Sequence, residues 1–176
     1  MDPWVRIDKG NEEGLKQGDL VPKCYVPIYP EDYGDRAGEE NVSVPVDVYD
    51  VIVITQSCDL VDDKIKLVAV LPFYSLSDFE KYNPAFAKNG KWENVRKGRV
   101  EGLHLIASPI DPKNWRASIV VDFREIYGLP LRYMKKRTGD LEPRWRLRSP
   151  FREEFSRAFG NYYSRVAVDK PFGKIN

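Results

Sequence analysis

Long apolar runs and a recognisable export signal are both missing from this sequence. No stretch approaches the roughly eighteen consecutive apolar residues that a membrane-spanning helix requires, so no membrane partner is expected. The opening segment, MDPWVRIDKG, contains acids and no apolar run, which is unlike a secretory signal peptide. The composition, with 42% hydrophobic and 31% charged residues, is typical of a globular protein. We therefore expect a folded protein of the cytoplasm.

Cysteine and histidine are scarce: the 176 residues include two cysteines, Cys24 and Cys58, and one histidine, His104. Without an export signal, both cysteines are expected to be reduced thiols. These three side chains cannot complete a four-ligand structural zinc site, although a three-ligand site with an open water position stays possible. The turn Asp59, Asp62, Asp63 offers oxygen ligands for a divalent cation, but such turns are more often simply solvated.

Several catalytic and cofactor motifs are absent too. Neither G-x-x-x-x-G-K-[ST] nor G-x-G-x-x-G occurs, and there is no G-x-S-x-G. The first two motifs cradle phosphates and the third presents a nucleophilic serine. The sequence therefore gives no reason to expect a cofactor.

Charge is distributed very unevenly, although the net charge is only +1. Residues 1–63 hold 5 Lys and Arg against 15 Asp and Glu, whereas residues 131–165 hold 10 against 4. Such a division predicts either a basic face that meets a polyanion or two regions that attract each other within the fold.

Apolar patterning predicts a sheet that is mainly antiparallel. A strand is expected over about 19–28, and the hairpin 50–73 combines two strongly apolar strands around a polar turn. Further strands are expected at 103–108, 117–123 and 144–148. Pro22 suggests an edge position for the first strand, because proline cannot donate a hydrogen bond to a neighbour.

Helices are expected at two places. Ser77 followed by Glu80 matches a capping box and opens a helical insertion over about 76–101. Ser149 as N-cap and Pro150 at the first position open a C-terminal helix over about 149–166. Its core-facing stripe is Phe151, Phe155, Phe159, Tyr162 and Val166. The sequence thus predicts one α+β domain, mainly β, over 1–176: a strongly bent antiparallel SH3-like barrel with strands about 17–73 and 103–148, a helical insertion and a C-terminal helix.

A polar cluster, Gln56-Ser57-Cys58-Asp59, follows the central strand. A thiol nucleophile needs a base or a positive field, and His104 is the one conventional base available to Cys58. The alternative is that the polar side chains satisfy backbone groups in a turn and that the thiol is unreactive.

The basic C-terminal third offers a second candidate site. Cations interleave with aromatics here, as in proteins that hold phosphates and stack bases. In a strand, RWRLR would place Arg144, Arg146 and Arg148 on one half-exposed face and Trp145 in the core. Lys135, Lys136 and Arg137 add charge nearby. The alternative is that these residues pair with the acidic N-terminal third.

The order of elements resembles the MazF/PemK type of toxin. The matching segments are QGDLV (17–21), VIVITQS (51–57), IKLVAVLPF (65–73) and ASIVVDFREIYGLP (117–130). The resemblance implies an SH3-like barrel with a C-terminal helix that cuts RNA. That family has Arg-Pro before the second strand and Ser or Thr at its end; Tyr49-Asp50 replace the former, and Thr55 fits the latter. QSCDL, GRVEGLHL and SPFREEFSRAF also resemble uncharacterised prokaryotic and phage-associated proteins.

Three functions are therefore predicted as alternatives. The first is a nucleic-acid-interacting barrel of bacterial or phage origin, binding RNA or DNA and related to toxin-like ribonucleases of toxin–antitoxin systems, without their usual arginine. The second is a non-catalytic module that binds a neighbouring protein partner or forms a homodimer. The third is a thiol enzyme using Cys58 and His104.

Overall fold

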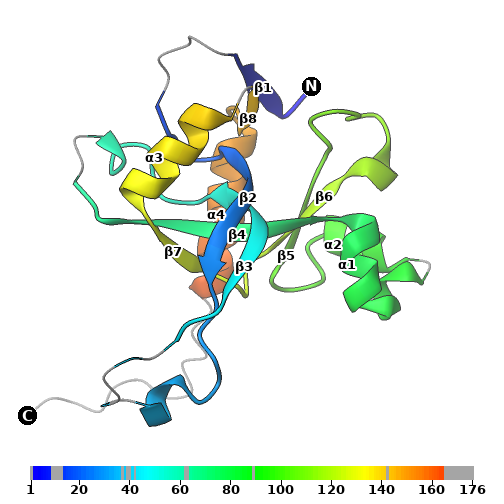
Figure 1. Cartoon of the computed structure of the whole chain (residues 1–176). Helices are drawn as coiled ribbons and strands as arrows, with labels where there is room; N and C mark the ends of the chain where they lie inside the picture. The colour runs from blue at the N-terminus through cyan, green and yellow to red at the C-terminus, as the bar shows by residue number, and fades with distance from the viewer. Residues whose placement is uncertain are drawn as a thin grey trace, which may run out of the picture.

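The fold is built around an antiparallel sheet, as seen in a computed structural model that describes residues 2–8, 14–36, 38, 41, 43–61, 64–88, 90–141 and 143–164 (Figure 1). The path through this sheet is β2 (Leu20–Pro27), β3 (Val46–Val53), β4 (Leu67–Ser75), β6 (Ile119–Asp122) and β5 (Leu103–Ile106). A further strand, β7 (Tyr127–Pro130), pairs with β4. A separate two-stranded sheet joins β1 (Trp4–Ile7) to β8 (Arg144–Leu147).

Strand β4 is the centre of the sheet, because it pairs with three others. Its middle pairs with β3, its first half also with β7, and its last residues with β6. Val68, Val70 and Leu71 are all fully buried, as expected for a strand covered on both faces. The predicted antiparallel hairpin 50–73 is confirmed, and so is the strand predicted at 19–28.

The prediction of an α+β, mainly β fold is confirmed, whereas a closed barrel is not. Within the described residues no sheet closes on itself, and β2 and β5 stand at its two ends. Part of the reason is α3 (Leu131–Asp140), a helix in a region predicted as barrel strand. Leu131, Met134 and Thr138 are buried at helical spacing, and the hydroxyl of Tyr133 accepts a hydrogen bond from the Tyr25 N–H at the edge of β2. A helix thus covers the edge at which a closing strand would pair.

The other helices differ from prediction mainly at their ends. Helix α1 (Leu76–Tyr82) is capped by Ser75, which accepts a hydrogen bond from the Asp78 N–H, so the predicted capping box at Ser77 is wrong by two residues. Helix α2 spans only Lys91–Arg96. Helix α4 (Phe151–Tyr163) has Pro150, not Ser149, at the N-cap position.

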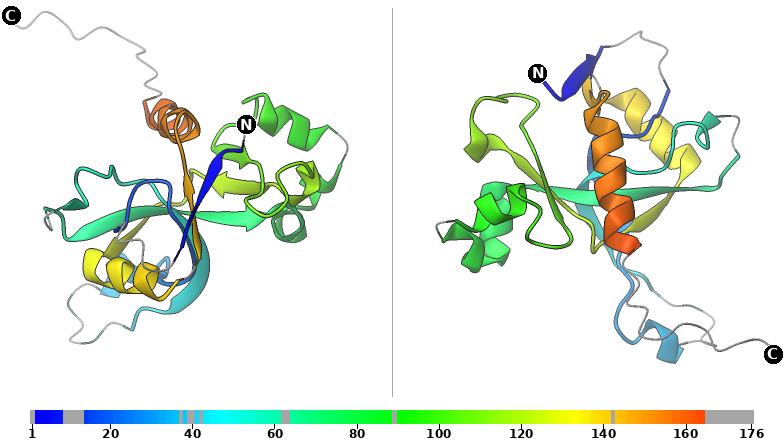
Figure 2. Two further views of the ribbon diagram at one scale, coloured as in Figure 1. Left: turned by 90° about the horizontal axis from the view of Figure 1, so that it is seen from above. Right: turned by 180° about the vertical axis from the view of Figure 1, so that it is seen from behind.

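Three groups of apolar side chains form the interior. Helix α3 covers one face of β2, β3 and β4, and α4 covers the other face together with β1 and β8. Phe155 of the predicted stripe is fully buried there, whereas Phe151, Phe159 and Tyr162 are half-buried; Val166 lies outside the described residues. Helices α1 and α2 form a third group with β5 and β6, set to one side of the molecule (Figure 2).

Candidate nucleic-acid interface

The basic strand β8 is largely structural. Arg146 donates from Nε to Asp19 Oδ1 at 2.5 Å, and Arg144 Nε lies 3.4 Å from Asp19 Oδ2. All three side chains are buried, and both guanidiniums also donate to the Gly14 carbonyl. The expectation of a half-exposed arginine face is therefore corrected for these two residues. The alternative prediction, pairing with the acidic N-terminal third, is confirmed at Asp19.

The remaining predicted cations are more accessible. Arg148 follows β8 and is exposed, and Lys135 and Lys136 are exposed on α3. Arg137 is half-buried and donates to the Pro22 carbonyl at the start of β2. Trp145, predicted as a core residue, is half-buried at the edge of the group under α4.

Cys58 and His104 occupy different surroundings. Cys58 is exposed in a turn, with Sγ 3.7 Å from Gln56 Oε1 and 3.8 Å from Asp59 Oδ1. The His104 imidazole on β5 packs 5.6 Å from the rings of Phe123 and Phe155, and burial lowers its pKa to about 4. The structure does not bring the proposed thiol and base together.

Thr55 and the acidic turn serve local backbone contacts. The Thr55 hydroxyl accepts a hydrogen bond from the Ala69 N–H at 2.7 Å, which ties the end of β3 to β4. Asp59 donates its N–H to the Gln56 carbonyl, as in a satisfied turn. Asp62 and Asp63 lie outside the described residues, and within the rest of the chain no group of three potential metal ligands is found.

The two thiols should differ sharply in native-state labelling. With iodoacetamide at neutral pH, we expect modification of exposed Cys58 and none of Cys24, whose burial raises its pKa to about 11. Peptide mass spectrometry would assign the label. The His104→Ala variant should leave the Cys58 rate unchanged; a rate that drops in this variant would restore the thiol–histidine hypothesis.

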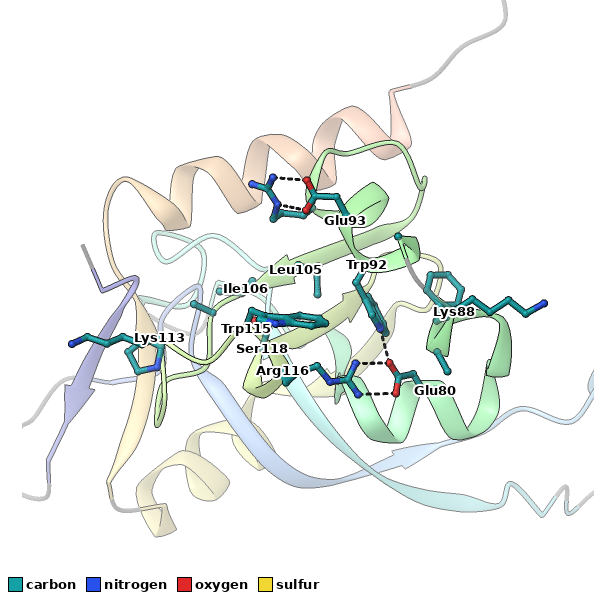
Figure 3. Close-up of a pocket in the computed structure, with 16 residues that line it drawn as sticks. Glu80, Lys88, Trp92, Glu93, Leu105, Ile106, Lys113, Trp115, Arg116 and Ser118 are labelled. Carbon is teal, nitrogen blue, oxygen red and sulfur yellow. Dashed lines mark hydrogen bonds and ion pairs between the residues drawn. The ribbon is translucent and has the colours of Figure 1, made fainter.

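One cavity in the described part of the chain was not anticipated from the sequence. This tryptophan groove, of about 890 Å³, lies between the α1–α2 region, β5 and the loop that precedes β6. Trp92 and Trp115 stand on its two sides, and Lys113 and Lys88 lie at opposite ends (Figure 3). The apolar floor includes Leu105 and Ile106 of β5.

Glu80 fixes the geometry of the groove. It accepts the Trp92 indole N–H at 2.7 Å and both guanidinium donors of Arg116, at 2.7 and 2.9 Å (Figure 3). The hydrogen bonds from Arg116, followed by that from Trp92, lower the pKa of Glu80 to about 2. Arg116 also lies 5.2 Å from the Trp115 ring, a cation–π distance. One carboxylate thus links both sides of the groove.

The groove carries a surplus of positive charge. Its cations are Lys88, Arg96, Lys113 and Arg116, and its acids are Glu80 and Glu93, so the sum is 4 − 2 = +2. Arg116 pairs with Glu80 and Arg96 with Glu93, which leaves the two lysines as the surplus. Trp115 is 61% exposed despite its contact with Arg116. The groove therefore combines an open aromatic ring with two lysines, one at each end, that have no acidic partner in the groove.

The residues that form this groove come from several separate segments of the sequence, so no single motif predicts it. The segment PIDPKNW reads as a turn, and nothing local shows that its tryptophan would stand opposite Trp92. A tryptophan in a polar turn, next to Lys113 and Arg116, is a signal from which a surface role could have been predicted.

No helix in the described part of the chain is both long and apolar enough to cross a membrane. A scan against family models gives no match to this chain, and a search of curated proteins finds no significantly similar sequence. The resemblance to MazF/PemK toxins therefore stays a prediction.

Proposed function

We propose that the protein binds single-stranded nucleic acid in the tryptophan groove. The observation that carries this proposal is the exposed Trp115 ring in a groove with a lysine at each end, neither of which has an acidic partner in the groove. Single strands are held by aromatic stacking of bases together with cations along the backbone. Trp115 supplies the stacking surface, and Lys88 and Lys113 supply the phosphate contacts.

The energetics of such binding separate into two parts. Stacking of one base on Trp115 contributes about 1–3 kcal/mol and depends little on salt. Each lysine–phosphate contact releases counterions, so two contacts give a log–log salt slope of about −1.4 on a single strand. Arg116 acts differently, because its guanidinium is already occupied by Glu80 and holds the rim in place.

We further propose that the open sheet is a variant of the SH3-like barrel, with α3 in place of a closing strand. Support comes from the hairpin β3–β4 and from α4 packed across it. Cleavage of RNA is not part of the proposal, for two reasons. Tyr49-Asp50 stand where the toxin family has Arg-Pro, and the Thr55 hydroxyl accepts a hydrogen bond from the Ala69 N–H.

Fluorescence anisotropy with a labelled ten-nucleotide single strand, at two salt concentrations, tests this function. Trp115→Ala is expected to weaken binding about 10- to 100-fold, with the salt slope unchanged, because a stacked base is lost. Lys88→Ala with Lys113→Ala should reduce the slope by about 1.4.

The matched control is Ile110→Ala, because Ile110 is 85% exposed in the same loop but does not line the groove. Its affinity should equal that of the wild type. The proposal fails if the wild type binds no single strand at low salt, or if Trp115→Ala binds as well as Ile110→Ala does.

A further inference from the structure

The outer half of the β2–β3 hairpin has one apolar face that no other described element covers. On β3, Ile52, Val48 and Val46 share this face, because alternate residues of a strand point to the same side. Ile52 is buried in the group under α4, whereas Val48 and Val46, nearer the tip, are 52% and 60% exposed. Tyr25 and Pro27 of β2 pair with these two valines, and Tyr25 is 63% exposed. Helix α4 therefore covers only the part of this face that is close to the body.

The opposite face of the same hairpin is closed. Cys24 and Val26 of β2 are fully buried in the group under α3, and Tyr49 of β3 packs against that group. The hairpin projects from the body of the molecule (Figure 1), so its uncovered face is presented to the surroundings. Contiguous exposed apolar surface of this kind marks a place where another segment binds.

The exposed face leads into a groove of about 630 Å³. Val48 lines it together with residues of β4, α1 and the segment 122–125, and Tyr82 of α1, which is 82% exposed, lines it too. The charged lining residues are the acids Asp47, Asp50, Asp78, Asp122 and Glu125 and the cations Lys81 and Arg124, so the net charge is 2 − 5 = −3. Both cations of this acidic groove already have acidic partners, in the pairs Lys81 with Asp78 and Arg124 with Asp122.

Two carboxylates of the acidic groove, Asp50 and Glu125, form no ion pair with any described residue. Asp50 accepts the Lys23 N–H at 2.8 Å, and Glu125 accepts the Tyr127 hydroxyl at 3.1 Å. These donors are neutral, so neither carboxylate is matched by a cation. Asp50 is two residues from Val48 and on the same face of β3, which places negative charge directly beside the exposed apolar surface.

We propose that this face and the acidic groove together bind a basic amphipathic segment of a second protein. The apolar side chains of the segment cover Tyr25, Val46 and Val48, and its Lys or Arg side chains meet Asp50 and Glu125. Charge complementarity selects this occupant, because a groove of net negative charge repels the phosphates of a nucleic acid. Two copies of this chain paired through this face would bring their acidic grooves together, and like charges in an interface are unfavourable.

Selection from a phage-displayed library of random twelve-residue peptides tests this proposal on the full chain. It is run in parallel on the wild type, on Val48→Lys and on Ile110→Lys. The first variant places a cation on the proposed surface. The second is the matched control, because Ile110 is 85% exposed and does not line the acidic groove. Peptides retained by the wild type and by Ile110→Lys but not by Val48→Lys should combine Lys or Arg with apolar residues.

A representative selected peptide is then measured by fluorescence anisotropy against Asp50→Asn with Glu125→Gln. We expect binding at least about tenfold weaker than to the wild type, and weaker binding at high salt, because charge attraction is reduced in both cases. Each amide keeps an oxygen that can accept the existing hydrogen bond, so this double variant tests charge even if Val48→Lys does not fold. Trp115→Ala should leave the peptide affinity unchanged, which separates this result from that for the tryptophan groove.

Three results would overturn the proposal. The first is a selection that yields no basic peptide able to distinguish the wild type from folded Val48→Lys. The second is equal affinity of the selected peptide for the wild type and for the amide variant. The third is a dimer in sedimentation velocity that Val48→Lys dissociates, since a second copy of the chain would then cover this face.

Discussion

Replacing Asp19 by alanine is expected to destabilise the protein by about 3–5 kcal/mol, because it removes the carboxylate that balances buried arginine charges. The carboxylate is fully buried between Arg144 and Arg146 and also accepts the Lys16 N–H at 3.0 Å. Without it, two buried guanidiniums lose the carboxylate that they share while remaining charged. Urea unfolding followed by circular dichroism would measure the loss as a lower midpoint with an unchanged slope.

Two comparisons make the Asp19 result specific. Glu31→Ala removes an exposed acid and should change stability by no more than about 0.5 kcal/mol. Asp19→Ala combined with Arg146→Met should be less destabilising than the sum of the two single changes. The reason is that Arg146→Met removes one of the buried positive charges that Asp19 balances. A loss below about 1 kcal/mol for Asp19→Ala would mean that the other contacts of the two arginines, such as those to the Gly14 carbonyl, suffice without the carboxylate.

Acidification should weaken the fold through His104. Its pKa is near 6.5 in the unfolded chain and about 4 in the folded one, since burial between aromatic rings disfavours the charged form. Between these values the unfolded state binds the proton and the folded state does not, so stability falls as pH decreases from about 6.5 towards 4. The full difference amounts to about 3 kcal/mol.

The variant His104→Phe isolates this effect, because phenylalanine suits the ring cluster and does not titrate. Carboxylates such as Glu80 also titrate in acid, but they contribute equally to wild type and variant. Unfolding free energies measured from pH 7 to pH 4 should therefore diverge, with the wild type losing about 3 kcal/mol more than the variant. Parallel curves would show that the imidazole is solvated in the folded state.

The pattern of apolar residues was sufficient to predict those strands and helices whose spacing lies within one segment. The apolar runs of β3 and β4 fix a central hairpin, since only a strand covered on both faces hides side chains from consecutive positions. The aromatic spacing from Phe151 to Tyr162 fixes α4 in the same way. The uneven charge distribution left two alternatives, a basic face for a polyanion or attraction within the fold, and the Asp19 contacts with β8 are an instance of the second.

The local pattern gave a wrong prediction where the burial of a side chain depended on a partner that is distant in the sequence. Alternating arginines suggest an exposed face, because a charged side chain is rarely buried unless it is paired. Asp19 supplies that pairing from more than a hundred residues away. In α3, the segment LRYMKKRTGD has few apolar residues, and its helical form depends on Met134 and Leu131 packing under β2.

Patterns along the chain were enough to predict the fold class, the central hairpin and the C-terminal helix, because periodicity and length are properties of a single segment. Which cations are buried, whether the sheet closes and where the tryptophan groove lies depend on contacts between segments that are far apart in the sequence. The tryptophan groove joins Glu80, Trp92 and Trp115 from three separate segments, and no spacing along the chain encodes that meeting. Surface chemistry of this kind arises only when folding removes some charges from water and leaves others beside open apolar surface.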